Sequence, residues 1–370
     1  MMARTVVRAL VLLVLVLAGC ATAAPPASPT VVPGAPPSSP SGSTTAPALE
    51  RGRALLARGE MAAAAGAFRQ ALGAQPDLLE ARAGLGTSLA AVGDLDAAVE
   101  ELRAGLRRQP DALPLRIALA RVLVARQEWP AAREELERVL SAQPDLLDAR
   151  YSLGVVRYAQ GDVAGAIDAY RRVLAADPLQ PDARYSLALV LKLAQRDAEA
   201  TPELVTAAEA GHARAQYFAG TAYAAGVGVP RDLTAAVAWW FRAAEQGVPQ
   251  AEQALAQLRQ VALGRSRRPP AESQAAVQAF ADHRASLWKQ FPDLSANAEE
   301  SAGAALLRAG RVAEAVPVLI REAAALGEPA ARLLETLYEQ GVDGQLGARD
   351  ARILGYLQSA AAEGRRAPIR

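Results

Sequence analysis

Residues 79–178 decide the fold, because one pattern of residue types returns in them every 34 positions. Residues 79–110 read LEARAGLGTSLAAVGDLDAAVEELRAGLRRQP, and residues 147–178 read LDARYSLGVVRYAQGDVAGAIDAYRRVLAADP. Prolines, small residues and alanines form three interleaved series with this spacing: Pro76, Pro110, Pro144 and Pro178; Gly52, Gly86, Ala120, Gly154 and Ala188; Ala64, Ala98, Ala132, Ala166 and Ala200. Three series in one period indicate an internal repeat.

Each repeat predicts two short helices joined by a tight turn, because its apolar residues are spaced three or four apart within each half. Gly59, Gly93 and Gly161 stand where the first helix should end, a position that favours left-handed backbone. Gln127 and Gln195 take that place in repeats three and five, so we expect slightly less favourable turns there. A hairpin this small must stack on its neighbours to bury its apolar face. The sequence therefore predicts an all-α fold, an α-solenoid of stacked helical hairpins.

The small residues predict close crossings between the two helices of a repeat. In repeat four we expect Gly154 and Ala166 to lie where the helices approach, with Leu153 and Tyr170 filling the space beside them. These patterns resemble the tetratricopeptide repeat (TPR) family over residues 48–200. Repeat two carries the family's marks at Leu85, Gly86, Gly93, Ala98, Leu102 and Pro110, and repeat four at Leu153, Gly154, Gly161, Ala166, Tyr170 and Pro178.

The pattern lengthens after the fifth repeat. Residues 201–262 resemble a Sel-one-like repeat, a longer relative of the TPR, through Gly211, Ala215, Gly220, Tyr223, Gly226, Gly228, Val229, Asp232, Ala236, Trp239, Ala243, Ala244 and Gly247. We expect Asp232 to cap the helix after the loop. Trp239 and Trp240 are interpreted as packing residues, with a ligand platform as the alternative.

Residues 263–295 break the repeat, and we expect a joint between two stacked blocks there. The basic run GRSRRPP at 264–270 precedes one predicted helix that ends near Gln290, before a turn at 291–293. A disordered loop followed by a bridging helix is the alternative interpretation. Residues 296–364 then resemble a TPR-like hairpin and a second Sel-one-like repeat, and residues 365–370 form a tail. The marks of this block are Leu306, Gly310, Ala315 and Leu319, then Gly327, Ala331, Leu334, Tyr338, Gly341, Asp350, Tyr356, Ala360, Ala361 and Gly364.

The N-terminus predicts export. Arg4 and Arg8 precede an apolar run that is too short to span a bilayer, which needs about 20 residues, so residues 1–19 are interpreted as a signal peptide. The ending Leu-Ala-Gly-Cys resembles the lipobox of bacterial lipoproteins, which implies that Cys20 becomes the lipid-bearing first residue. An ordinary signal peptide with an incidental cysteine is the alternative. Cys20 is the only cysteine, so disulfides and a thiol catalyst are not expected.

Residues 20–47 are rich in Pro, Ser and Ala and carry no charge, which predicts a disordered tether between lipid and repeats. Ala21 follows the cysteine, where an Asp in that family implies retention at the inner membrane. We therefore expect a protein of the bacterial cell envelope, lipid-anchored and facing the periplasm, at the outer membrane rather than the inner one.

Charge and residue inventory argue against several function classes. Lys and Arg number 40 against 39 Asp and Glu, so no nucleic acid partner is indicated, and membrane contact is expected through the N-terminal lipid alone. His212 and His283 are the only histidines, and neither has a partner at metal-ligand spacing. No phosphate-binding Gly-Lys-Ser/Thr motif occurs. We expect no catalytic residues, metal, cofactor or small-molecule substrate.

The TPR resemblance implies a binding groove lined by the first helix of each repeat. The groove positions are Asp148, Tyr151, Val155 and Tyr158 in repeat four, and Asp182, Tyr185, Leu189 and Lys192 in repeat five. Tyr151 and Tyr185 occupy equivalent places, and tyrosine buries a rigid ring while offering a hydroxyl, so the pair is a candidate hot spot. The alternative is that both tyrosines only fill space within the superhelix.

The leading hypothesis is a non-enzymatic scaffold that binds protein or peptide partners. By resemblance, such TPR lipoproteins assist the assembly of envelope, secretion or pilus complexes. The second hypothesis is a binding module for a cell-wall glycan or another envelope ligand.

Overall fold

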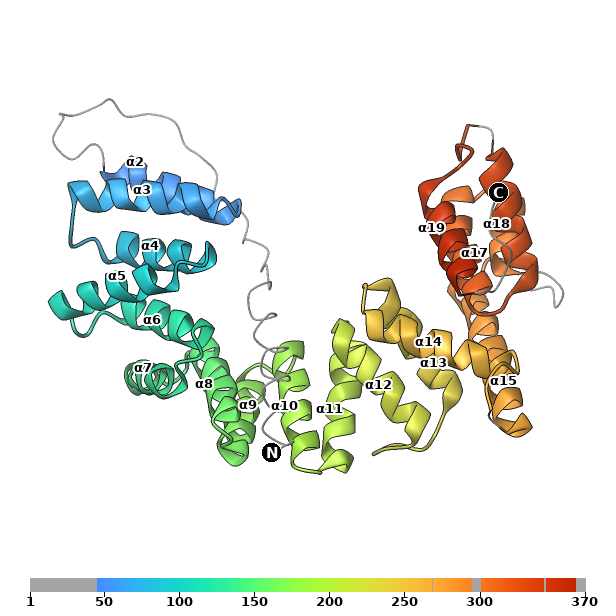
Figure 1. The fold of residues 1–370 in the computed structure, drawn as a ribbon, viewed down its shortest axis with the longest axis horizontal. Coiled ribbons are helices and arrows are strands. Elements are labelled where there is room, and N and C mark those ends of the chain that lie inside the picture. Colours follow the sequence, from blue (N-terminus) through green and yellow to red (C-terminus); the bar gives the residue numbers. More distant parts are fainter. Residues whose placement is uncertain (1–44, 268, 295–300, 343, 364–370) are drawn as a thin grey trace. The chain divides into compact units, whose positions relative to one another are not determined.

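The computed structural model describes residues 45–267, 269–294, 301–342 and 344–363, which form an all-helical protein. These ranges contain eighteen α-helices and one 3₁₀ helix, and within them no β-strand forms beyond an isolated bridge between Val342 and Leu346. The predicted fold class is confirmed. The chain divides into two compact units, residues 1–178 and 179–370, and each is described by itself (Figure 1).

The first unit consists of four consecutive helical hairpins. Their helices are α2 (Thr45–Ala57) with α3 (Met61–Ala74), α4 (Leu79–Ala91) with α5 (Leu95–Arg108), α6 (Leu113–Ala125) with α7 (Trp129–Ala142), and α8 (Leu147–Ala159) with α9 (Val163–Ala176). α2 begins three residues before the predicted start of the array at residue 48, with Pro47 in its first turn, where proline is tolerated. The predicted signal peptide and all but the last residues of the predicted tether lie outside the described residues.

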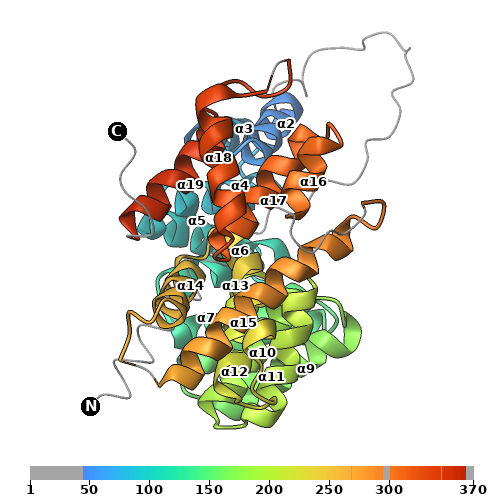
Figure 2. The ribbon, with the colours of Figure 1, turned by 90° about the vertical axis from the view of Figure 1, so that its right-hand side faces the viewer.

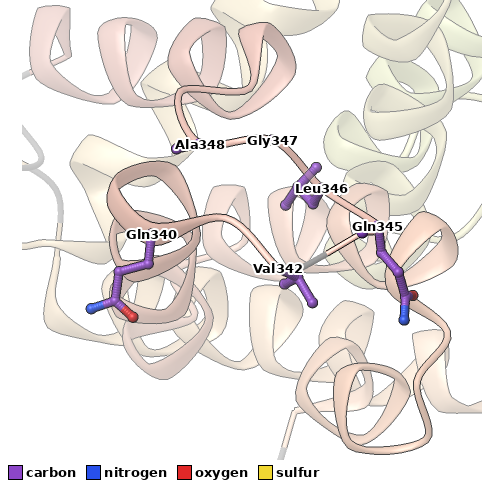
Figure 3. Close-up of a pocket in the computed structure, with 7 residues that line it drawn as sticks. Gln340, Val342, Gln345, Leu346, Gly347 and Ala348 are labelled. Carbon is purple, nitrogen blue, oxygen red and sulfur yellow. The ribbon is translucent and has the colours of Figure 1, made fainter.

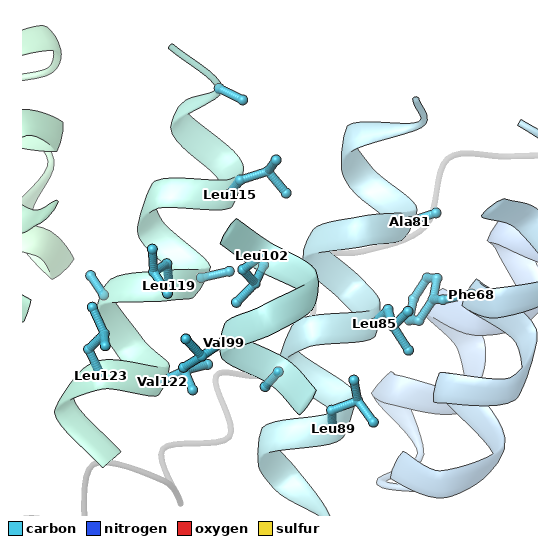
Figure 4. Close-up of a cluster of buried hydrophobic side chains, with 14 of the residues drawn as sticks. Phe68, Ala81, Leu85, Leu89, Val99, Leu102, Leu115, Leu119, Val122 and Leu123 are labelled. Carbon is cyan, nitrogen blue, oxygen red and sulfur yellow. The ribbon is translucent and has the colours of Figure 1, made fainter. Parts of the chain in front are cut away.

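Packing between the hairpins follows one rule. Each second helix packs on the first helix of the next hairpin, as α3 does on α4, and successive first helices also pack together, α2 on α4, α4 on α6 and α6 on α8. The first helices therefore form one continuous wall of the unit. One apolar core runs through it, and Leu85 of α4 lies next to Phe68 of α3 (Figure 4).

The predicted close crossing at Gly154 is confirmed. A Cβ atom at this glycine would lie 2.6 Å from Cε1 of Tyr170, whose ring is buried, so no larger residue fits without a shift. Ala166 and Leu153 are also buried. The neighbouring repeat repeats this arrangement, since a Cβ at Gly86 would lie 2.6 Å from Cγ of Leu102.

The turns inside the hairpins are also as predicted. Gly59, Gly93 and Gly161 have φ values of +77°, +90° and +82°, and Gln127 and Gln195 adopt +62° and +58°. Both glutamines therefore occupy left-handed backbone that favours glycine, while the hairpins around them remain intact.

The second unit begins with hairpins of the same kind. Its first six helices are α10 (Pro181–Leu193), α11 (Asp197–Glu209), α12 (Ala213–Ala225), α13 (Leu233–Glu245), α14 (Pro249–Ala262) and α15 (Pro270–Leu287). Asp232 caps α13 as predicted, because its carboxylate accepts a hydrogen bond of 3.0 Å from the N–H of Ala235. α15 packs against both α13 and α14.

The predicted bridging helix ends in two steps. α15 stops at Leu287, and the 3₁₀ helix η1 (Trp288–Gln290) continues to the predicted end. Phe291 then leaves the helical region at φ −131°, ψ 70°, because the residue before a proline is pushed toward extended backbone.

Four helices close the second unit: α16 (Ala302–Arg308), α17 (Val312–Ala324), α18 (Glu328–Gln340) and α19 (Ala351–Ala362). α17, α18 and α19 lie together in both views (Figures 1 and 2). Leu306, Ala315 and Leu319 are fully buried, as the predicted TPR-like hairpin requires.

The C-terminal end of α17 carries charged side chains inside the protein. Arg259, His283 and Glu322 are at most 8% exposed. Arg259 forms a bidentate ion pair with Glu363, with its Nη2 2.6 Å from Oε2. Arg259 and Arg284 donate to the carbonyls of Ala324 and Ala325, which suits cations at a helix C-terminus. We call this group, Arg259, His283, Arg284, Glu322 and Glu363, the charged cluster.

Candidate partner-binding surface

The groove positions of α8 lie in the first unit, and they differ in exposure. The Asp148 side chain is 73% exposed and lies 3.8 Å from the guanidinium of Arg121. Tyr151 is half-buried, with its ring centroid 5.5 Å from that of Tyr170. Val155 and Tyr158 are buried, and burial raises the pKa of Tyr158. A partner on this helix would therefore meet Asp148 and part of Tyr151.

The groove positions of α10 lie in the second unit. Tyr185 is 5% exposed and stacks on His212, with 4.3 Å between ring centroids, and Leu189 is also buried. Asp182 is exposed, while Lys192 is half-buried and lies 2.9 Å from the carboxylate of Asp197. Tyr185 thus packs inside its unit. Whether any of these positions binds a partner stays a prediction.

His212 has a structural role, as its place at a hairpin corner indicated. Its Nδ1 accepts a hydrogen bond of 3.0 Å from the N–H of Ala215 and so caps α12. A neutral ring then carries its proton on Nε2, which lies 3.4 Å from Oδ1 of Asp182. The hydrogen bond from His212 lowers the pKa of Asp182. The three side chains Asp182, Tyr185 and His212 therefore join α10 to the start of α12.

The two tryptophans of α13 separate into different roles. Trp240 is 7% exposed, and its Nε1 donates to the carbonyl of Tyr217 at 3.3 Å, as expected of a packing residue. Trp239 is half-buried, and the guanidinium of Arg242 lies 4.6 Å from its ring centroid. Arg242 thus already covers a face of that ring.

A periodic arginine is the functional-looking feature that sequence analysis missed. Arg82, Arg116 and Arg150 are 34 residues apart, and each donates to the carbonyl of the proline before its repeat. Arg82 and Arg116 also pair with glutamates 19 residues later, Glu101 and Glu135. The spacing was visible in the sequence. These pairs tie the two helices of a hairpin to the turn before them, so we assign them to the scaffold.

A hollow in the loop between α18 and α19 does not make a site. It is lined by residues of that loop alone, around 340–348, and Figure 3 shows Val342 and Leu346 between outward-pointing Gln340 and Gln345. Val342 and Leu346 exchange two backbone hydrogen bonds, of 2.8 and 2.9 Å, so these groups are not offered to a ligand.

Two further features complete the search. Among the described residues, no three His, Cys, Asp or Glu side chains are grouped so that they could hold a metal ion. The helices of the described ranges include none that is long and apolar enough to cross a bilayer. Cys20 lies outside these ranges.

Comparison with known proteins identifies the repeats. The tetratricopeptide repeat family matches residues 49–112, 117–181 and 158–211. The chain therefore contains TPRs, and proteins with this repeat bind protein or peptide partners.

Solved structures agree with this fold. PilF of Pseudomonas aeruginosa is 18% identical, with a TM-score of 0.50, over 58% of this chain and 97% of that one. A MamA protein is 25% identical over 48% of this chain and 97% of its own, with a TM-score of 0.41. YrrB, described as a TPR protein with an unusual peptide-binding site, is 22% identical over 51% of this chain and 98% of its own, with a TM-score of 0.41. The search of curated proteins gave no match.

Proposed function

We propose that this protein is a non-enzymatic scaffold of the bacterial cell envelope that holds protein or extended peptide partners. The observation that carries the proposal is the TPR wall of the first unit, in which α2, α4, α6 and α8 pack in succession. Such a wall presents one residue set per repeat to an extended partner. The expected partners are components of an envelope, secretion or pilus complex during assembly.

The proposed binding positions are the exposed members of the predicted groove. On α8 these are Asp148 and Tyr151, and on α10 they are Asp182 and Lys192. Half-buried Tyr151 supports an anchoring role, because it joins a rigid ring to a polar hydroxyl. Tyr185 would act indirectly, by fixing the position of α10.

The membrane part of the proposal rests on Cys20. Its lipobox-like context supports acylation, with the protein facing the periplasm, and Ala21 supports the outer membrane. Cys20→Ala should move the protein from the membrane pellet to the soluble fraction, because each acyl methylene buried contributes about 0.8 kcal/mol. Equal pelleting of parent and variant would contradict the lipid anchor.

The binding part is tested with variants matched to burial. Tyr151→Ala should keep most of its melting temperature and lose partner recovery from solubilised envelope, since a central anchor contributes about 2 kcal/mol or more. Tyr185→Phe keeps the stacked ring and should recover partners as the parent does. Undiminished recovery by Tyr151→Ala would exclude this anchor. A parent that recovers no protein but sediments with purified cell wall would favour a glycan-binding module instead.

A further inference from the structure

A second surface of the first unit has the features of a peptide site. A groove of about 400 Å³ runs between α5 and α7, with α6 beneath it. Apolar side chains from all three helices line it, namely Leu106, Leu119, Leu123 and Ala131. Arg103 and Arg107 stand on its α5 side, one turn apart and exposed.

This groove is separate from the wall of first helices. On α6 the wall positions are Ile117 and Arg121, whereas the groove takes Leu119 and Leu123. A shift of two residues turns the helix by about 200°, so the two sets lie on opposite sides of α6. A partner in the groove leaves the wall free.

The charges around the groove leave two cations uncompensated. Arg116 pairs with Glu135 at 2.7 Å, and Arg138 pairs with Glu134. Arg103 and Arg107 have no hydrogen-bond or ion-pair partner within the part of the chain that the structure describes. Free guanidiniums beside an apolar floor match carboxylates that flank apolar side chains.

The repeat gives the surface a direction. Arg69 of α3 occupies the same repeat place as Arg103, 34 residues earlier, and it is also exposed and without a partner among the described residues. Glu137 holds that place on α7. Positive charge therefore extends from the groove toward α3, while α7 ends it.

We propose that this groove binds an extended, acidic and apolar segment of a partner protein, with carboxylates on Arg103 and Arg107 and an aliphatic or aromatic side chain on the floor between α5 and α7. The acidic end of the segment runs toward Arg69. A polyanion such as nucleic acid fits less well, because Glu134 and Glu135 border the same groove and the floor is apolar. This inference rests on the proposed scaffold function and names a partner class and a second surface for it.

The test is selection of random 12-residue peptides on the purified full-length protein, followed by affinity measurements with the enriched sequences. We expect Asp or Glu beside Leu, Ile or Phe, and a loss of at least about tenfold in affinity for Arg103→Glu/Arg107→Glu. Arg51→Glu is the matched control, because Arg51 is exposed on α2, which packs on α3 and α4. It should bind as the parent does, and Arg69→Glu should show a smaller loss than the pair.

Each other outcome overturns the groove. Enriched peptides without acids, or peptides whose affinity survives Arg103→Glu/Arg107→Glu, would place peptide binding elsewhere and leave the scaffold function standing. Equal binding of phosphatidylglycerol vesicles or single-stranded oligonucleotide, lost in the same variant, would assign the surface to another ligand class. If no peptide is enriched, the groove is rejected, and the envelope pulldown with parent protein decides the scaffold function independently.

Discussion

The four hairpins of the first unit and the charged cluster of the second bury their residues by opposite means. The hairpins use small and apolar side chains in a fixed register, and Ser88 is the buried polar side chain they include among the described residues. The cluster buries Arg259, His283 and Glu322 around the end of α17. Where the repeat supplies complementary faces, no charge is needed inside. Where it is lost at α15, helix ends meet, and their backbone groups require polar partners.

Glu322 illustrates that requirement. Its carboxylate accepts hydrogen bonds from the N–H groups of Ala302 and Gly303, at 2.7 and 3.2 Å, at the start of α16. Burial raises the pKa of this carboxyl, while these N–H groups stabilise its ionised form. The cluster therefore joins helices through a few strong contacts, and the hairpins join them through many weak ones. Single substitutions should accordingly have larger effects in the cluster.

The largest effect is expected for Arg259→Ala. It would leave Glu363 without its bidentate partner and the carbonyl of Ala324 without a donor. Removing one member of a buried pair costs about 3 kcal/mol, measured by urea unfolding at pH 7. Arg259→Met/Glu363→Met should recover much of the loss. Arg108→Ala breaks an exposed pair with Asp77 and should cost less than about 1 kcal/mol. Equal losses for the two single variants would remove the distinction.

The next effect is a pH dependence that belongs to His283. Its ring stacks on Phe241, with 4.5 Å between centroids, and its nitrogens have no hydrogen-bond partner within the described residues. Burial, together with Arg321, Arg242 and Arg284, lowers its pKa to about 4. The unfolded chain then binds a proton below about pH 6.5 that the folded chain refuses until about pH 4. Stability should fall as pH falls through this window, by about 2 kcal/mol between pH 7 and 5.

The control for this prediction is His283→Phe, which keeps an aromatic ring and removes the titration. Its stability should change less between pH 7 and 5 than that of the parent, in matched urea titrations. Glu322 acts in the opposite sense, because its raised pKa favours the folded state at low pH, and it is present in both proteins. Parallel pH profiles for parent and variant would contradict the assignment to His283.

These two regions also differ in what sequence could predict. The hairpins repeat, so Gly154, Gly161 and Gln127 could each be assigned from equivalent positions. The pair Arg259 and Glu363 is 104 residues apart and belongs to no period, so nothing in the sequence joins them. The partner groove was predicted only in part, because helical phase places Tyr185 on the expected helix but cannot tell that His212 covers it.

A smaller effect is expected inside the hairpins for Gly154→Ala. The added methyl would meet the Tyr170 ring at 2.6 Å, which costs about 1–3 kcal/mol, against about 1 kcal/mol gained in helix propensity. The net loss should be about 1 kcal/mol by thermal melt. Repeats three and five hold Ala120 with Leu136 and Ala188 with Leu204 at the equivalent places, all buried. Gly154→Ala/Tyr170→Leu should therefore lose less than the sum of its single variants, and strict additivity would mean that these places do not touch.

The smallest effect is a gain in stability at Gln127. Its φ of +62° is uncommon for a residue with a side chain, and equivalent turns use glycine, as at Gly161. Gln127→Gly would relieve about 1 kcal/mol of backbone strain, partly offset because glycine has more freedom in the unfolded chain. A net gain of a few tenths of a kcal/mol should raise the urea midpoint with an unchanged m-value. The reverse change, Gly161→Gln, should lower the midpoint by a similar amount, because the hairpins share one turn geometry. A loss of stability in Gln127→Gly would show that the glutamine side chain stabilises its turn by more than the strain it carries.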